Sequence, residues 1–245
     1  MKRALALALV LCACDKPTSD PVPAPSASAI PPPKPALSAK PKKTLEDCKP
    51  GNTITFDDPT LEKVVRRQLK KKTGDIDKTE LAKVKTLDLS QASANEQLDP
   101  CIFPSFTGLK GLYLAPGTLD DLKPIASLTQ LESLRIAATR IKDLTPLSAM
   151  TNLDRLDLGR TPVSDLSPIA GLVKLTSIML DRTEVSDLSP MSKMKQLKVL
   201  ILKDTRVSDL SPLKGLTNLE QLYIAGSLVK DTSSLSHLKK LHIHE

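Results

Sequence analysis

Side chains able to do chemistry are few in this chain of 245 residues. All three histidines, His237, His242 and His244, fall within nine residues of Glu245, the last residue. His242 and His244 could share a strand face and, with Glu245, hold a zinc ion. A polar chain end is the simpler interpretation. Because histidine occurs nowhere else, a Ser/His/Asp arrangement in the body of the chain is impossible.

A second group of reactive types is a set of evenly spaced aspartates: Asp121, Asp143, Asp165, Asp187, Asp209 and Asp231. Their number suggests acid–base chemistry, but each stands before a short turn sequence such as Asp-Leu-Ser-Pro, where aspartate stabilises the turn. No Walker A loop or GxGxxG motif is present. The sequence therefore predicts a protein that is not an enzyme and that uses no metal or cofactor.

The N-terminus has the features of an export signal. Lys2 and Arg3 precede ten apolar residues, 4–13, which are too few to span a bilayer. The ending Leu11-Cys12-Ala13-Cys14 resembles a bacterial lipobox. That resemblance implies a signal peptide over residues 1–13 and acylation of Cys14, whose several acyl chains would anchor the protein stably. A soluble secreted product is the alternative.

The lipobox also decides how the cysteines are used. The resemblance implies that Cys12 leaves with the signal and that Cys14 carries the lipid, so that Cys48 and Cys101 remain as a pair in an oxidising compartment. We predict a disulfide between them, with two free thiols as the alternative. Residues 14–47 are rich in Pro, Ala, Ser and Lys, which favours an extended, disordered tether. We expect a protein that is lipid-anchored in the bacterial cell envelope, at the outer membrane or cell surface rather than the inner membrane.

A 22-residue repeat dominates the rest of the chain. It is marked by Leu109, Leu131, Leu153, Leu175, Leu197, Leu219 and Leu241. With each of these leucines as position 1, positions 4 and 6 are apolar and alternate as in a strand. Apolar positions 14, 17 and 20 suit a 3₁₀-like return, with Ser as its cap and Pro at its first position. One unit cannot bury its apolar side alone, so the units must stack.

This pattern resembles the leucine-rich repeat family, in particular the 22-residue internalin-like type. The resemblance implies an α/β repeat fold: a leucine-rich repeat solenoid over residues 84–245 with a parallel concave sheet and a 3₁₀-like or irregular convex side. It also implies a helical N-terminal cap over residues 48–83. In the cap, Asp58-Pro59 should begin a helix that buries Leu61, Val64, Val65 and Leu69, and Gly74 should end it.

Two departures from the family pattern give further expectations. The family's Asn at position 9 is replaced by threonine in four units: Thr139, Thr161, Thr183 and Thr205. We expect these hydroxyls to form a weaker hydrogen-bond ladder between coils. The last unit has Thr232 in place of Leu and Ser234 in place of Pro, so we expect its end to fray or to be covered by a partner.

The outward-facing strand positions bring together Arg, Tyr and apolar side chains. The predicted partner-binding residues are Tyr113, Arg135, Arg155, Asp157, Arg160, Met179, Asp181, Arg182, Val199, Ile201, Lys203 and Tyr223. Such a mixture is typical of a protein-binding surface, although scattered apolar side chains are also common on ordinary sheets. The net charge is +7, but residues 44–245 carry 28 basic and 26 acidic side chains without a dense basic stripe. We therefore expect no nucleic-acid partner.

These observations predict a monomeric, lipid-anchored protein that binds a protein or other macromolecule through its concave sheet, without catalysis. One alternative is a structural envelope protein that packs laterally and has no concave ligand. A second alternative is a metal-dependent enzyme that uses the terminal histidines.

Overall fold

The computed structural model describes residues 42–48, 50–92 and 96–245. The predicted signal peptide, Cys14 and the tether up to residue 41 lie outside the described residues. Over the part that is described, no helix is long and apolar enough to cross a membrane.

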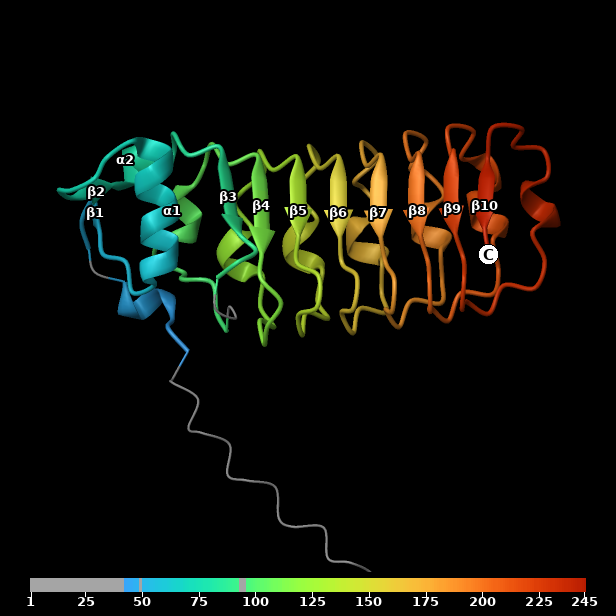
Figure 1. The fold of residues 1–245 in the computed structure, drawn as a ribbon, viewed down its shortest axis with the longest axis horizontal. Helices are drawn as coiled ribbons and strands as arrows, with labels where there is room; N and C mark the ends of the chain where they lie inside the picture. Colours follow the sequence, from blue (N-terminus) through green and yellow to red (C-terminus); the bar gives the residue numbers. More distant parts are fainter. Residues whose placement is uncertain (1–41, 49, 93–95) are drawn as a thin grey trace, which may run out of the picture. The chain divides into compact units, whose positions relative to one another are not determined.

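The described chain forms a solenoid whose eight parallel strands make one sheet in sequence order (Figure 1). The strands are β3 (Thr86–Leu89), β4 (Gly111–Leu114), β5 (Ser133–Arg135), β6 (Arg155–Asp157), β7 (Ser177–Met179), β8 (Val199–Ile201), β9 (Gln221–Tyr223) and β10 (His242–His244). Each coil returns the chain to the same edge, so each strand pairs with the strand of the next coil. The predicted solenoid with a parallel sheet is confirmed.

The core is a stack of aliphatic layers, one for each repeat position. The inward side chains at position 4 are paired strand to strand and are at most 1% exposed: Leu112, Leu134, Leu156, Ile178, Leu200 and Leu222. Burial of each such side chain stabilises the fold by about 1.5–3 kcal/mol. Positions 11 to 20 close each layer from the other side, as Val163, Leu166, Ile169 and Leu172 do. No coil completes its core without a neighbour.

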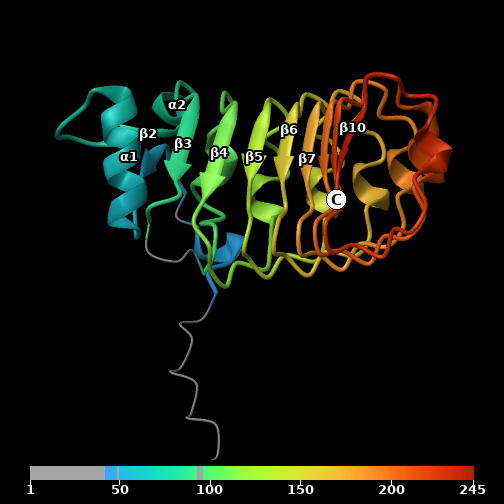
Figure 2. The same cartoon turned by 45° about the vertical axis from the view of Figure 1, so that its right-hand side comes forward.

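The return segments are 3₁₀ turns on the side of the coils opposite the sheet (Figure 2). They are η3 (Lys123–Ile125), η4 (Thr145–Leu147), η5 (Ser167–Ile169), η6 (Ser189–Met191), η7 (Ser211–Gly215) and η8 (Ser233–Leu235). The predicted capping role of Ser is wrong, because Ser167 is the first residue of its turn. Asp165 instead accepts the Ser167 N–H at 2.8 Å, so aspartate is the residue that starts each return.

The threonines at position 9 do not join the coils, so the predicted ladder between coils is wrong. Thr183 Oγ1 donates to the Leu180 carbonyl of its own coil at 2.7 Å, and the other three threonines bond in the same way. Adjacent coils are joined by backbone instead, as where Arg182 N–H donates to the Lys203 carbonyl at 2.7 Å. A hydroxyl is shorter than the Asn amide and reaches only the nearest carbonyl.

The helix of the N-terminal cap begins as predicted and ends differently. Helix α1 (Pro59–Leu69) starts at Asp58, whose Oδ1 accepts the Thr60 N–H at 2.7 Å. It buries Leu61 and Val65 and lies beside β3 (Figure 1). The helix ends at Lys70, which adopts a left-handed φ of 54°, so the predicted end at Gly74 is wrong.

The remaining cap elements are short and were not predicted. Strand β1 (Thr53–Ile54) pairs antiparallel with β2 (Ile76–Asp77), and α2 (Lys78–Leu81) follows directly. Two further 3₁₀ turns, η1 (Leu45–Asp47) and η2 (Phe103–Ser105), flank the cap.

A disulfide ties this region together. Cys48 and Cys101, 53 residues apart, are joined with an S–S distance of 2.06 Å, which confirms the predicted bond. Residues 42–47, which were predicted to belong to the tether, are held on the folded unit. Lys43 Nζ contacts Asp57 at 2.9 Å and Asp99 at 2.8 Å. The folded unit therefore begins before Cys48.

The last coil departs from the regular repeat spacing. His242 lies opposite Gln221, whereas Gln221 lies opposite Val199, so the last step along the chain is shorter by a single residue. This offset reverses the faces of the last strand, because alternate side chains point to opposite sides. It places Ile243 against the core and His242 and His244 on the outside.

Candidate binding surface

The sheet face is the outer side of β3–β10, the side opposite the 3₁₀ turns. Four of the predicted residues form one apolar row on it: Met179, Val199, Ile201 and Tyr223. Met179 lies opposite Ile201, and Ile201 lies opposite Tyr223, so the row crosses β7, β8 and β9 without a break. All four side chains are half-buried. The sheet brings these residues together because they share positions 3 and 5 of consecutive repeats.

Charged residues beside the apolar row pair across coils. Arg135 Nε donates to Asp157 Oδ2 at 2.9 Å, and Asp157 Oδ1 accepts the Gly159 N–H at 3.1 Å. Nearer the C-terminus, Arg182 Nε donates to Asp204 Oδ2 at 3.2 Å. Asp204 was not among the predicted residues. Its signal in the sequence is that it stands one full repeat after Arg182, the other residue of its pair.

A shallow hollow of about 460 Å³ lies beside the Arg135–Asp157 pair and reaches Met179, the first residue of the apolar row. Its lining includes Arg135, Asp157, Arg160, Met179 and Asp181. Gly159 also lines the hollow, and a Cβ there would meet Asp181 Oδ1 at 2.5 Å, so a larger residue would displace the Asp181 side chain. The hollow presents both signs of charge and one thioether, which suits a polar protein surface with an apolar anchor.

The C-terminal end of the sheet face is aromatic. The Tyr223 and His244 rings stack with centroids 4.2 Å apart, and Lys203 Nζ lies 5.0 Å from the Tyr223 centroid. His244 Nε2 also lies 2.7 Å from Gln221 Oε1. His244 was not predicted as a surface residue, because a constant 22-residue repeat places it at position 4, which points inward. The signal was Ile243, the apolar residue between two histidines, which must face the core.

Not every predicted residue joins this patch. Tyr113, the other tyrosine, is on β4 and packs over Gly111, where a Cβ would meet its hydroxyl at 3.4 Å. It lies five strands from Tyr223, so it is not part of the apolar row. Arg155 is exposed, and its Nε lies 3.5 Å from Asp154.

The terminal histidines form no metal site with their neighbours. Nowhere in residues 42–48, 50–92 or 96–245 is a group of three or more His, Cys, Asp or Glu side chains placed to hold a metal ion. Residues 66–72, near the end of α1, contain five basic side chains, and two of them pair within the cap. Arg66 Nε contacts Glu62 at 2.7 Å and Lys71 Nζ contacts Glu80 at 3.0 Å.

Comparisons with known proteins agree with this architecture. A family model described as leucine-rich repeats (2 copies) matches residues 195–240. A search of curated proteins by sequence found no match. Among solved structures, an internalin (inlF) from Listeria monocytogenes aligns with a TM-score of 0.69 and 32% identity, over 77% of this chain and 56% of that chain.

Two further structures share the fold. Internalin C2 of Listeria monocytogenes aligns with a TM-score of 0.67 and 23% identity, over 77% of this chain and 93% of that chain. A leucine-rich repeat protein of Leptospira interrogans aligns with a TM-score of 0.61 and 21% identity, over 67% of this chain and 44% of that chain. The chain thus spans little more than half of the first internalin. The stacked coils, the matching repeat model and these similarities identify the chain as a leucine-rich repeat protein related in structure to internalins.

Proposed function

We propose that this protein binds another protein through its sheet face and catalyses no reaction. The observation that carries the proposal is the apolar row of Met179, Val199, Ile201 and Tyr223, which is continuous over three strands and half-buried. Contiguous apolar side chains next to Arg and Tyr mark protein-binding surfaces. Repeat proteins use such extended faces for binding.

The arrangement of the face supports a division of roles. The apolar row supplies the area whose burial drives association, and Tyr223 presents a ring that the stacked His244 holds in place. The flanking pairs Arg135–Asp157 and Arg182–Asp204 set the orientation of the partner, because charges at the rim of an interface favour one alignment.

The test begins with a photo-reactive amino acid placed at position 201 in living cells. A matched probe at Ser189, exposed on the convex side, is the control. We expect position 201 to crosslink a distinct protein that position 189 does not. Ile201→Asp combined with Tyr223→Ala should then lower capture of that protein more than about tenfold, the scale of a lost hot spot.

A second control matches the chemistry of the substitution. Val173 is 44% exposed and lies outside the sheet face, and Val173→Asp should leave capture unchanged. Undiminished capture by the double variant, or equal crosslinking from both probes, would reject the sheet face as the binding surface. A solenoid that crosslinks only to copies of itself along its sides would favour a structural envelope role instead.

We also propose that the protein is exported and anchored by lipid on Cys14, in the outer membrane or at the cell surface. This proposal rests on the N-terminal sequence: a basic start, ten apolar residues and the lipobox-like Leu11-Cys12-Ala13-Cys14. The Cys48–Cys101 disulfide supports it, because such bonds form outside the cytosol. Metabolic labelling with a fatty-acid analogue should label the wild-type protein and not Cys14→Ala. Labelling of both would rule out that residue as the anchor.

A further inference from the structure

One edge of the solenoid carries a cluster of lysines that the sequence reasoning did not find. This edge is formed where each 3₁₀ return leads into the next strand. In the last three coils it presents six exposed lysines, the lysine edge: Lys193, Lys195, Lys198, Lys214, Lys239 and Lys240. Stacking brings together lysines from separate repeats, which lie far apart in the chain.

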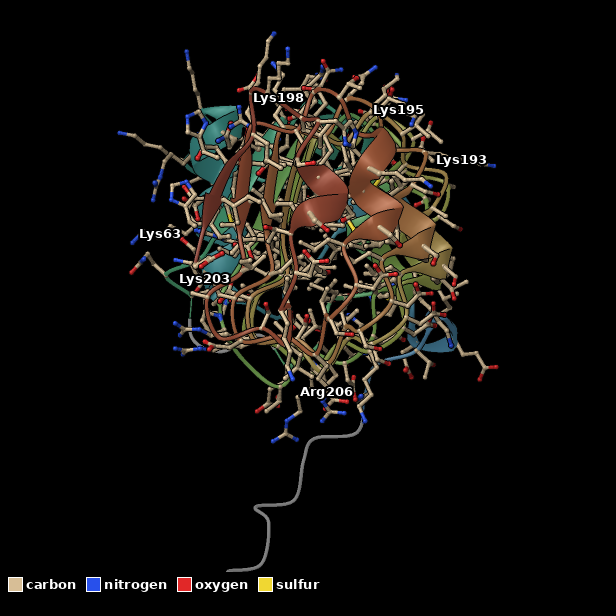
Figure 3. The ribbon with its side chains drawn as sticks, turned by 90° about the vertical axis from the view of Figure 1, so that its right-hand side faces the viewer. Lys63, Lys193, Lys195, Lys198, Lys203 and Arg206 are labelled. Carbon is tan, nitrogen blue, oxygen red and sulfur yellow. A yellow bond between two sulfur atoms is a disulfide. The ribbon has the colours of Figure 1, made fainter. Side chains whose placement is uncertain are left out.

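Contacts between coils hold these positions on one surface. The Asn218 side-chain amide donates to the Lys195 carbonyl at 2.8 Å, and Lys195 Nζ donates to the Gly215 carbonyl at 2.7 Å. His237 Nε2 lies 2.7 Å from the Lys214 carbonyl. Figure 3 shows Lys198 at the top of the coils, Lys195 at the upper right and Lys193 at the right, away from Lys203 and Arg206.

The lysine edge is not neutralised by its surroundings. None of the ion pairs found within the described part of the chain involves any of the six lysines. Glu220 is the one carboxylate in the edge segments 192–198, 214–220 and 236–242. The opposite edge of the same coils carries both signs of charge: Asp187, Asp209 and Asp231 start the returns, and Arg206 and Lys230 stand near them in the chain. The lysine edge is therefore the strongly basic part of these coils.

We propose that the lysine edge binds an anionic phospholipid surface and lays the solenoid on the membrane by that edge. The cluster contains lysine and no arginine, and lysine is a flexible point charge that suits mobile headgroups rather than a fixed fork of contacts. A lysine near an anionic bilayer strengthens binding by about fivefold. Single-stranded nucleic acids are held by stacked aromatic rings, whereas both tyrosines lie on the sheet face.

This inference is independent of the sheet-face proposal, because it uses a different surface. Its test measures sedimentation of the full chain with vesicles of phosphatidylcholine alone or with about 30 mol% phosphatidylglycerol, at about 0.05 M salt. Wild type is compared with Lys193→Gln/Lys195→Gln/Lys198→Gln. The matched control is Lys63→Gln/Lys142→Gln/Lys230→Gln, which removes three exposed lysines elsewhere. All three proteins carry Cys14→Ala, so that no acyl chain anchors them, and their N-terminal segments are identical.

We expect wild type and the control to bind the anionic vesicles more tightly than the neutral ones. The edge variant should lose more than about tenfold of that affinity, and salt of about 0.5 M should abolish the difference. Equal binding by the edge variant and the control would overturn the proposal. Tighter binding of wild type to duplex DNA than to the anionic vesicles at the same salt would overturn the membrane assignment. Partner capture through Ile201 should be unaffected by the edge variant.

Discussion

The position-9 threonines test how much a single buried hydroxyl contributes to one coil. Thr183 is 5% exposed and donates to the Leu180 carbonyl at 2.7 Å. Thr183→Val keeps the shape and removes the donor, so the free energy of unfolding should fall by about 1 kcal/mol. Urea denaturation measures it, with Thr217→Val at an exposed site as the control. Equal stability of both variants would contradict a structural role for the hydroxyl.

The aspartates that start the returns make stability depend on pH. Hydrogen bonds from the hydroxyl and N–H of the next Ser hold the pKa values of Asp165, Asp187 and Asp209 below their usual range. A lowered folded pKa stabilises the protein above the unfolded pKa of about 3.9, and that stability is lost as pH falls through the folded value. We therefore expect the free energy of unfolding to fall below about pH 4.

The triple variant Asp165→Asn/Asp187→Asn/Asp209→Asn separates this effect from general acid unfolding. The amide oxygen of Asn still accepts the hydrogen bond from the turn N–H, but the side chain does not titrate. Its free energy of unfolding, followed by urea denaturation between about pH 5 and pH 2, should fall less steeply than that of wild type. Parallel profiles for the two proteins would show that these aspartates do not control the acid response.

For single residues, the sequence predicted the roles that follow from spacing in the chain. It missed the roles that depend on backbone geometry. The turn role of Asp165 follows from its place two positions before Ser167, so spacing alone found it. The direction of the Thr183 hydroxyl could not be found in this way. It depends on the bend of the chain just before it, where Arg182 has a φ of 55°.

That bend recurs in five coils and can be tested directly. Position 8 is left-handed in five coils: Ala138, Arg160, Arg182, Asp204 and Gly226. A non-glycine residue in this region costs about 1 kcal/mol, so Ala138→Gly should raise the free energy of unfolding by up to that amount. Ala126 has a φ of −56°, and Ala126→Gly should lower stability by about 0.5–1 kcal/mol. Thermal or urea unfolding measures the change in the free energy of unfolding of both variants. A loss of stability in both would contradict the prediction.

The strands and turns that belong to the regular repeat were predicted from the sequence, and the short elements outside that repeat were not. Six regular repeats fix the strands and 3₁₀ returns, because each unit has the same apolar spacing and must find the same place in the stack. The pairing of β1 with β2 was not predicted, because such short strands show no alternation of apolar and polar residues. The offset of β10 was also missed, although the apolar Ile243 between two histidines contained the information.

Across the whole molecule the two ends of the stack differ. At the N-terminal end α1 covers β3, and the Cys48–Cys101 bond fastens the cap. At the other end β10 pairs only with β9 among the described residues, Leu228 is 57% exposed and Ile243 is only partly buried. Each coil of a solenoid is stabilised by its neighbours alone, so a coil with one neighbour opens more readily than a coil with two.

This asymmetry predicts a gradient of stability along the solenoid. Hydrogen exchange should show weaker amide protection in β10 than in β7, because opening the last coil exposes one interface and opening a central coil exposes two.

Leu200→Ala in the fully buried centre should lower the free energy of unfolding by about 2–5 kcal/mol. Ile243→Ala should lower it by less than about 1 kcal/mol, because the Ile243 side chain is only partly buried and packs against a single neighbouring layer. Uniform protection from β4 to β10, with equal losses for the two substitutions, would show that the coils unfold as one unit. A binding partner or lipid surface that covers the last coil should then raise the protection of β10 more than that of β7.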